Sequence, residues 1–297
     1  MNVPRADFER RMHRVLAHVD AHLAGTLDLA TLAAVANFSP FHFHRLFAAW
    51  TGETLADYVR RRRVETAAVQ LLAQPRLSVL NAALGVGFGS AEAFTRAFRA
   101  RFGTAPTVWR AAERKHDQAD RKIGQAAAAG PADDGGTMNK PPPADVRLLD
   151  LPPVRIVYLR HRGAYGAPLQ RFWARSVAPW LVLHGREGRI TYGISHDDPG
   201  VTRAAACRYD AGVALADGET PARDELVARL PGGRYAGLRY DGPIERIGDG
   251  WTQLLRDWLP GTGLQLDARP CFERYPPDGG FDAGRLRCEI CVPVAPL

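Results

Sequence analysis

The chain of 297 residues is predicted to fold as two domains, an all-α domain followed by an α+β domain. Residues 1–115 show the apolar periodicity and the capping residues of helices, without an alternating β-branched run. Residues 145–297 alternate short β-branched runs with helical stretches. Residues 116–144 are rich in Ala, Gly and Pro and predict a flexible linker between the domains.

Seven helices are expected in the first domain. They cover residues 8–23, 29–37, 40–51, 54–73, 79–86, 91–102 and 106–113. Ser39 and Ser90 stand directly before two of them, where a serine oxygen can accept a hydrogen bond from the first turn. Pro75 follows the longest helix, which it cannot extend.

The second domain is predicted to contain short strands and two longer helices. The strands cover residues 146–151, 154–161, 190–194, 206–213, 227–230, 233–240, 271–275 and 286–294, and the helices cover 169–183 and 247–258. Segment 155–163 resembles segment 234–242, and each precedes a helix that carries two tryptophans. This weak repeat predicts a pseudo-twofold duplication with a cleft between the copies, where a ligand could bind.

The net positive charge of the chain lies entirely in the first domain. Residues 1–115 hold 16 Lys and Arg against 9 Asp and Glu, whereas the remaining residues hold 23 of each. A basic module of this kind suits a polyanionic partner such as DNA. No apolar run is long enough for a transmembrane helix, and the charged N-terminus is unlike a signal peptide. A cytoplasmic protein without a membrane partner is therefore expected.

Two sequence features resemble metal sites, but another role is expected for each. Cys288 and Cys291 have the spacing of a zinc or redox pair, yet they lie in a predicted strand, where positions three apart point to opposite faces. They are expected to be buried thiols. The run His-Asp-Asp at 196–198 precedes Pro199 and is interpreted as an Asp-rich turn. No metal, cofactor or catalytic residue is predicted.

One pattern occurs twice in the first domain, at a distance of 51 residues. The first copy is Phe43-x-Arg45-x-Phe47-x4-Gly52 and the second is Phe94-x-Arg96-x-Phe98-x4-Gly103. The two phenylalanines of a copy share one helix face and are expected to be core. A turn of about 100° per residue places other side chains outward or at the edge of the outward face. These are Phe41, His44 and Arg45 in the first copy, and Glu92, Thr95, Arg96 and Arg99 in the second.

A duplicated helical unit in a basic segment predicts two helices that enter two nearby grooves of DNA. Arg45 and Arg96 occupy equivalent positions, and an arginine can bind guanine through two hydrogen bonds. Glu92 can accept a hydrogen bond from cytosine, and Phe41 can pack on a thymine methyl group. Two further arginines, Arg99 and Arg101, are expected to contact phosphate.

The first domain, residues 8–115, resembles the AraC/XylS-type DNA-binding domain. The resemblance rests on the signature Gly87-Phe88-x-Ser90-x3-Phe94-x-Arg96-x-Phe98-x4-Gly103-x2-Pro106-x2-Trp109-Arg110. It implies two helix-turn-helix units joined by the long helix 54–73. It places base contacts on Phe41, His44, Arg45, Ala91, Glu92, Thr95 and Arg96. Because the two copies differ at these positions, two unlike half-sites are expected.

Residues 145–297 resemble the GyrI-like small-molecule-binding domain, on segments 175–180, 192–199, 207–210 and 288–293. Glu289 lies in an apolar strand, where it either pairs with an internal arginine or faces the cleft toward a cationic ligand. We expect the cleft, because in the family the equivalent acid often contacts ligand. The candidate aromatic walls are Tyr165, Trp180, Tyr192, Trp251, Phe272 and Tyr275.

Together these features predict a transcription regulator and not an enzyme. The first domain would bind double-stranded DNA, the second would bind a small hydrophobic or cationic effector, and RNA polymerase would be a further partner. One alternative is hydrolysis of reactive small molecules, with Glu289 as general base near Tyr165 or Tyr192. No nucleophile elbow or phosphate loop supports that alternative. The other alternative is that the second domain binds a macromolecule.

Overall fold

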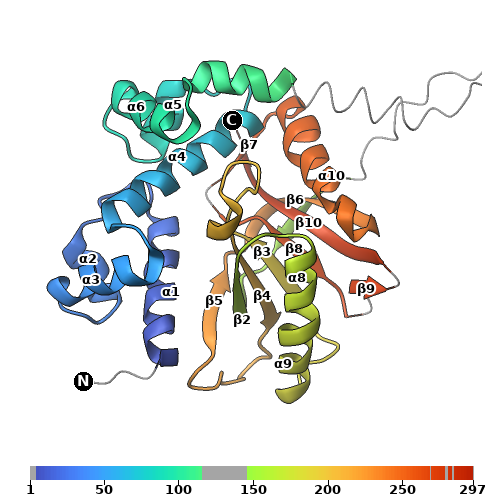
Figure 1. Ribbon diagram of the computed structural model, residues 1–297. Coiled ribbons are helices and arrows are strands. Elements are labelled where there is room, and N and C mark those ends of the chain that lie inside the picture. Colours follow the sequence, from blue (N-terminus) through green and yellow to red (C-terminus); the bar gives the residue numbers. More distant parts are fainter. Residues whose placement is uncertain (1–4, 116–145, 268, 278–279, 283, 297) are drawn as a thin grey trace, which may run out of the picture. The chain divides into compact units, whose positions relative to one another are not determined.

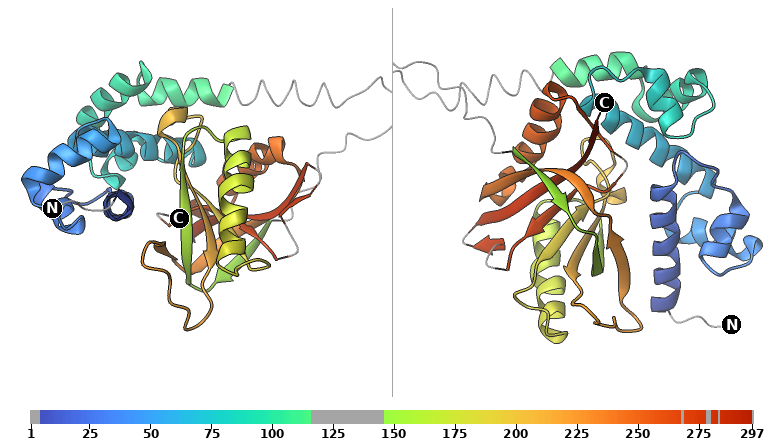
Figure 2. Two further views of the ribbon diagram at one scale, coloured as in Figure 1. Left: turned by 60° about the horizontal axis from the view of Figure 1, so that its bottom comes forward. Right: turned by 180° about the vertical axis from the view of Figure 1, so that it is seen from behind.

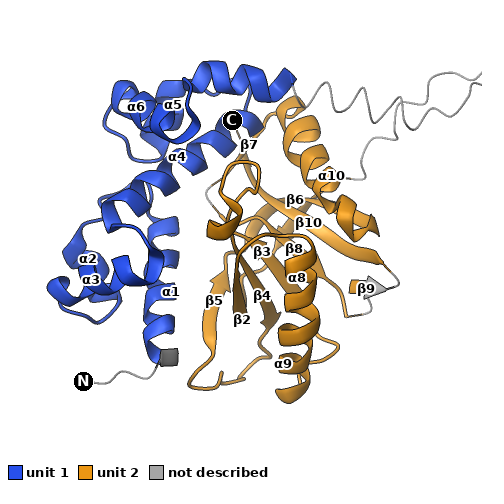
Figure 3. Ribbon diagram, viewed as in Figure 1, with its two compact units in different colours: residues 1–143 blue, residues 144–297 orange. Residues whose placement is uncertain are grey.

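The computed structural model describes residues 5–115 and 146–296, except 268, 278, 279 and 283. The chain divides into two compact units, residues 1–143 and 144–297 (Figure 3). The predicted linker, residues 116–144, lies outside the described residues. None of the described helices is long and apolar enough to cross a membrane.

The described part of the first unit is helical throughout, which confirms the all-α prediction. Its helices are α1 (Arg5–Ala21), α2 (Leu29–Val35), α3 (Pro40–Thr51), α4 (Leu55–Ala73), α5 (Val79–Gly85) and α6 (Ala91–Phe102), and residues 106–115 form another helix. The long helix α4 runs between the pair α2–α3 and the pair α5–α6 (Figure 1).

The ends of α3 and α6 explain part of the repeated pattern. Ser39 and Ser90 are the N-caps, and each side chain accepts a hydrogen bond from the backbone N–H three residues later. Gly52 and Gly103 end the helices at φ 81° and 75°, a left-handed conformation that glycine adopts without strain. Both caps therefore set where the two helices begin and end.

The phenylalanines of the pattern are core residues, as predicted. Phe43 and Phe47 are fully buried, and the Phe47 ring lies edge-on to Tyr58 of α4. Phe94 and Phe98 are equally buried in the second half of the unit. Full burial of one such side chain contributes roughly 1.5–3 kcal/mol, so the pattern anchors each helix by its inner face.

The second unit is a curled antiparallel sheet with helices, as Figure 2 shows, and the α+β prediction is confirmed. Its strands are β1 (Val146–Leu151), β2 (Val154–Arg162), β3 (Thr191–Ser195), β4 (Arg208–Ala214), β5 (Leu226–Leu230), β6 (Gly233–Pro243), β7 (Leu264–Leu266), β8 (Phe272–Tyr275), β9 (Gly280–Asp282) and β10 (Arg285–Pro296). They pair in the order β1-β6-β10-β8-β3-β4-β2-β5, and β7 and β9 also pair with β10. The short strands β7 and β9 were not predicted.

The strand order bears on the predicted duplication. The repeated segments lie on β2 and β6. The order β1-β6-β10-β8 from one edge corresponds to β5-β2-β4-β3 from the other. Two copies of one unit would produce such an order, and the duplication itself stays a prediction.

Two helical stretches lie on the sheet (Figure 2). The first runs through α8 (Ala167–Phe172), a π-helical segment (Trp173–Val177) and α9 (Ala178–Leu183). The second runs through α10 (Ile247–Thr252) and a π-helical segment (Gln253–Trp258). Both were predicted as uninterrupted helices, because apolar periodicity does not reveal the wider π turn.

Candidate functional site

The outer face of α3 carries three side chains predicted to contact DNA. His44 and Arg45 are exposed, and Phe41 keeps 70% of its surface in solvent. The ring of Phe41 lies in the first turn of the helix, beside His42. These side chains can reach a partner because Phe43 and Phe47 bury the opposite face of the helix.

The outer face of α6 carries the second predicted group. Glu92, Arg96 and Arg99 are exposed, whereas Ala91 and Thr95 are partly buried. The backbone N–H of Glu92 and the Ser90 side chain hold the pKa of Glu92 below its ordinary value, and Arg96 adds to this effect. The ionised carboxylate can only accept hydrogen bonds, as a contact with a cytosine amino group requires.

Arg101, which was expected to contact phosphate, is partly buried in the structure. Its guanidinium donates from Nη2 to Oε1 of Glu65 on α4 at 3.0 Å. It also lies 5.3 Å from the centre of the Phe102 ring. Because Glu65 is only 2% exposed, this ion pair ties the end of α6 to a buried acid of α4.

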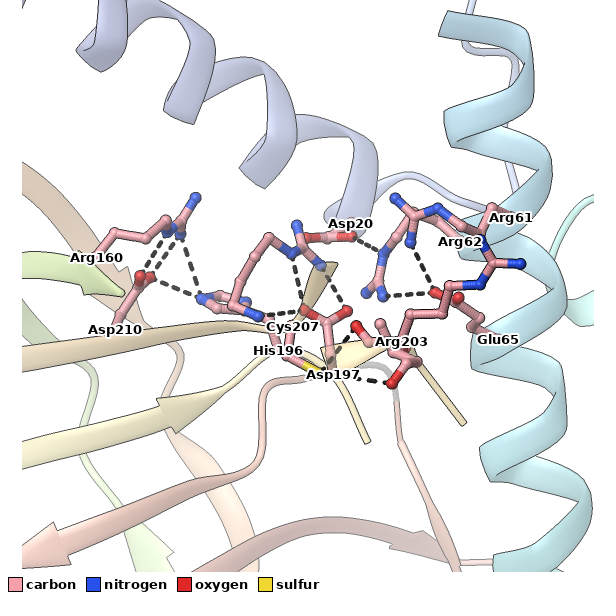
Figure 4. Close-up of polar contacts among 12 residues, drawn as sticks. Asp20, Arg61, Arg62, Glu65, Arg160, His196, Asp197, Arg203, Cys207 and Asp210 are labelled. Carbon is pink, nitrogen blue, oxygen red and sulfur yellow. Dashed lines mark hydrogen bonds and ion pairs between the residues drawn. The ribbon is translucent and has the colours of Figure 1, made fainter. Parts of the chain in front are cut away.

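Glu65 is the centre of an ion-pair chain that runs from the end of α3 to the end of α6. Besides Arg101 it accepts a hydrogen bond from Arg61 at 2.9 Å, and Arg61 also donates to Glu53 at 2.7 Å. Arg62 forms a longer ion pair with Glu65 at 3.6 Å (Figure 4). Arg62 also donates from Nε to Asp20 of α1 at 3.0 Å, which joins α4 to α1.

In the second unit, Glu273 on β8 is buried among aromatic side chains. Tyr275 and Tyr209 donate hydrogen bonds to its Oε2 at 2.8 and 3.0 Å, and the Trp251 indole donates to Oε1 at 3.1 Å. Trp173 packs on both tyrosines and donates to the Tyr209 hydroxyl at 3.3 Å. We call these five residues the Glu273 cluster. Within the described residues, Glu273 has no ion pair with a basic side chain.

Burial raises the pKa of Glu273, and the hydrogen bonds from Tyr275, Trp251 and Tyr209 lower it only in part. The carboxylate is 5% exposed, so its ionised form lacks both water and a counter-charge. A cation placed against it would supply that counter-charge. Aromatic rings around the acid would favour the same cation through their π faces.

The sequence makes room for this cluster at Gly193 on β3, which pairs with Glu273 across the sheet. A Cβ atom at this position would lie 1.9 Å from the Tyr209 hydroxyl and 2.5 Å from Oε2 of Glu273. Any side chain would therefore displace the tyrosine or the acid. Close approach of this kind is a common reason for glycine inside a strand.

Two of the six predicted aromatic wall residues, Trp251 and Tyr275, belong to the Glu273 cluster. Sequence reasoning missed Glu273, Tyr209 and Trp173. The alternation of a strand already placed Glu273 and Tyr275 on one face of the sheet. Nothing in the sequence showed that Tyr209 on another strand, and a tryptophan from each helical stretch, would meet them there.

Of the other four predicted wall residues, Tyr165 and Trp180 pack in the apolar cluster that contains Tyr209, and Tyr192 and Phe272 do not. Tyr192 and Phe272 pack together on the opposite face of the sheet, with ring centres 5.8 Å apart. Trp180 lies under the Arg186 guanidinium. Tyr165 packs near Tyr209, and its hydroxyl donates to the backbone carbonyl of Arg208 at 2.6 Å.

Glu289, which was expected to face the cleft, has an arginine partner in the structure. In the β8–β10 pairing Ile290 lies opposite Glu273, and Glu289 lies opposite Arg274. Glu289 is thus on the other face of the sheet from Glu273. Its carboxylate forms an ion pair with Arg274 at 2.5 Å.

A separate polar network lies at the β3–β4 end of the second unit. Asp210 pairs with Arg160 at 2.5 Å and with His196 at 2.7 Å (Figure 4). Asp197 pairs with Arg208 at 2.9 Å. Burial acts to raise the pKa of Asp210, but Arg160 and then His196 hold it below its ordinary value. These buried groups satisfy one another and position the loop after β3.

The two metal-like sequence features have the roles expected for them. Oδ1 of Asp198 accepts from the backbone N–H of Gly200 at 2.8 Å, which makes the Asp-rich turn. Cys288 packs with the residues on one face of the sheet and Cys291 with those on the other, and both are buried. In the described residues, no group of His, Cys, Asp and Glu is arranged to hold a metal ion.

Two family models match the chain. A model described as the GyrI-like small molecule binding domain matches residues 144–295. A model described as a helix-turn-helix domain matches residues 32–112. The first match covers the sheet and helices of the second unit, and the second begins inside α2 and extends past α6.

Relatives align with most or part of the chain. The right origin-binding protein of Escherichia coli strain K12 is 26% identical over 303 residues, which span 94% of this chain and 96% of that protein. The transcriptional regulator Rob of Salmonella typhimurium is 26% identical over 297 residues with the same coverage. The regulatory protein SoxS of E. coli K12 is 32% identical over 96 residues, 32% of this chain and 89% of SoxS.

Solved structures resemble each unit. The DNA-binding domain of AdpA, a global transcriptional factor in complex with a target DNA, is 34% identical and covers 35% of this chain and 94% of its own, with a TM-score of 0.33. The EcmrR C-terminal domain is 15% identical and covers 52% of this chain and 99% of its own, with a TM-score of 0.42. From the family matches and the relatives, the chain belongs to the AraC/XylS family of DNA-binding transcription regulators and carries a C-terminal GyrI-like small-molecule-binding domain.

Proposed function

We propose that α3 and α6 each enter a major groove and read two unlike half-sites. The exposed groups differ between the helices: Phe41, His44 and Arg45 on α3, and Glu92 with Arg96 on α6. Ala91 and Thr95 would contribute small contacts beside Glu92, and Arg99 would bind phosphate. The observation that carries the proposal is the outward position of Arg45 and Arg96 on helices whose inner faces are buried aromatic core.

A binding measurement tests this proposal. Duplexes selected by the full chain from a random pool would be titrated with the protein and with Arg45→Ala and Arg96→Ala. Loss of one bidentate guanine contact costs about 1–3 kcal/mol and relaxes the preference at one base pair. Arg14→Ala removes an exposed charge from α1 and serves as the control. Equal losses in all three variants, without relaxed base preference, would contradict the proposed reading.

Phosphate contact by Arg99 has a different signature. Arg99→Ala should weaken binding to all sequences alike and lower the dependence of affinity on salt by about one unit of slope. Arg101→Ala should leave the slope nearly unchanged, because its guanidinium is held by buried Glu65. A smaller slope for the Arg101 variant than for the Arg99 variant would reverse these two assignments.

We propose further that the effector is an aromatic or hydrophobic cation bound at the Glu273 cluster. A buried carboxylate with three hydrogen-bond donors and no cationic partner among the described residues supports this. Burial makes the ionised acid costly without a cation, and two tryptophans and two tyrosines offer apolar and π surface to the same ligand. The effector would then bias how the first unit engages DNA and RNA polymerase in the cytoplasm.

The test compares two ligands of matched shape, benzyltrimethylammonium and neutral neopentylbenzene, by calorimetric titration. The cation should bind the full chain more tightly than the neutral compound. Glu273→Gln should reduce this preference by about 10-fold or more, since two opposite unit charges about 4 Å apart attract by about 4 kcal/mol at an effective dielectric constant of about 20. Glu289→Gln is the matched control on the other face. Equal binding of both compounds to the unaltered chain would exclude a charge-selective site.

Hydrolysis and a purely macromolecular partner are less well supported. The acid proposed as general base, Glu289, is ion-paired with Arg274, and the Tyr165 hydroxyl is engaged by a backbone carbonyl. We propose that the functional domains are residues 1–115 and 145–297, joined by 116–144. The second would act as a binding domain and not as an enzyme.

A further inference from the structure

Arg63, near the middle of α4, binds backbone from both halves of the first unit. Its Nε donates to the carbonyl of Leu23 at 2.9 Å and its Nη2 to the carbonyl of Gly25 at 2.7 Å, both in the segment that follows α1. Its Nη1 donates to the carbonyl of Gly87 at 2.8 Å, in the turn between α5 and α6. One side chain therefore joins the two helix-turn-helix halves.

The three acceptors are neutral carbonyls. Desolvation lowers the pKa of Arg63, and no carboxylate contributes. Arg63 is therefore held by hydrogen bonds to carbonyls and not by an ion pair. The planar guanidinium suits this role, because its donors can bind several acceptors at fixed angles. Its neighbour Arg60 differs, since it is exposed and paired with Asp57 of the same helix.

The surroundings show why this link matters. A hollow of about 960 Å³ lies between the halves and is lined by residues of both, including Gly25, His44, Arg63 and Gly87. Gly87, at φ 87°, brings the turn so close that a Cβ atom would lie 2.6 Å from the carbonyl oxygen of Leu23 and 2.9 Å from Nη2 of Arg63.

We propose that Arg63 is a positioning residue that sets the spacing between the two DNA half-sites. This inference rests on the proposed reading of two grooves by α3 and α6. One inserted base pair moves the second half-site by about 3.4 Å and rotates it by about 35°. If three charge-assisted hydrogen bonds keep the halves in a fixed relation, α3 and α6 cannot both fit the altered duplex, and affinity falls. If these bonds are lost, the halves can move relative to each other and both helices can still bind.

The experiment measures spacing preference with the full chain. A duplex selected by the unaltered protein is compared with versions that carry one base pair more or one fewer between the half-sites. The spacing ratio is the Kd on an altered duplex divided by the Kd on the selected one. The variants are Arg63→Met, which keeps the apolar stem, Arg63→Lys, which keeps the charge, and Arg60→Met as the control.

We expect a spacing ratio of about 10 or more for the unaltered protein, falling to about 3 or less in Arg63→Met, because methionine removes all three hydrogen bonds that join the halves. Arg63→Lys should fall in between, since an ammonium group cannot bind three carbonyls as one planar fork. Arg60→Met should keep the full ratio, even if its affinity falls equally on all three duplexes.

Two results would overturn the inference, and only one of them would also contradict the proposed reading of two grooves. A full spacing ratio in Arg63→Met shows that Arg63 does not set the spacing, while reading by two helices stands. A ratio near one in the unaltered protein removes the two-groove reading and Arg63's role together. If Arg63→Met does not fold, Gly87→Ala takes its place. A Cβ atom at Gly87 would disturb the same contact from the side of the turn, so the spacing ratio should fall in the same way.

Discussion

Glu65→Gln removes the charge at the centre of the ion-pair chain in the first unit. Glu65 is 2% exposed and contacts Arg61, Arg101 and Arg62 at 2.9, 3.0 and 3.6 Å. The amide keeps the shape of the side chain but leaves a surplus of buried positive charge. Removal of one partner from a buried ion pair costs about 3–5 kcal/mol, so we expect at least about 3 kcal/mol.

Thermal unfolding of the full chain, together with amide hydrogen exchange, measures this effect. For a unit of about 100 residues a loss of 3 kcal/mol corresponds to a fall in Tm of roughly 10 °C or more. Faster exchange should be confined to α4 and α6 and their neighbours, because Arg101 joins these two helices through Glu65. The second unit should keep its protection.

Glu53→Gln is the matched control, since Glu53 also pairs with Arg61 but its side chain keeps 27% of its surface exposed. An ion pair of this kind contributes about 1 kcal/mol or less. If Glu65→Gln cost no more than Glu53→Gln, the reasoning that the buried chain holds α6 in place would be refuted.

Two further predictions concern the second unit. Gly193→Ala should abolish cation binding at the Glu273 cluster and lower stability, because its Cβ would lie 1.9 Å from the Tyr209 hydroxyl; calorimetric titration that found normal binding would contradict this. Stability of the second unit should also fall in acid. The pKa of Asp210 is lower in the folded state, so its contribution is present above the unfolded value of about 3.9 and is lost as pH falls through the folded one. Asp210→Asn should flatten this part of a stability-versus-pH curve measured by denaturant unfolding, and an unchanged curve would count against it.

The sequence by itself determined the two fold classes, most element positions and the outward faces of α3 and α6. Caps and cores follow from local rules: Ser39 and Ser90 cap, Gly52 and Gly103 end the helices, and the phenylalanines between them share one face. Each of these depends on neighbours within about one or two turns of helix. Periodicity is therefore enough to tell an outward arginine from an inward ring.

Tertiary structure alone decided the roles of charged residues whose partners lie far away in the chain. Arg101 and Glu65 are 36 residues apart, and Arg63 reaches Gly87 across 24. Glu273, and not Glu289, lies among the aromatic side chains because the two acids are on opposite faces of the sheet. Strand alternation tells which residues share a face, but it does not tell which face carries the aromatic cluster. Long-range pairing of side chains sets where the buried charges go, and no local pattern contains that information.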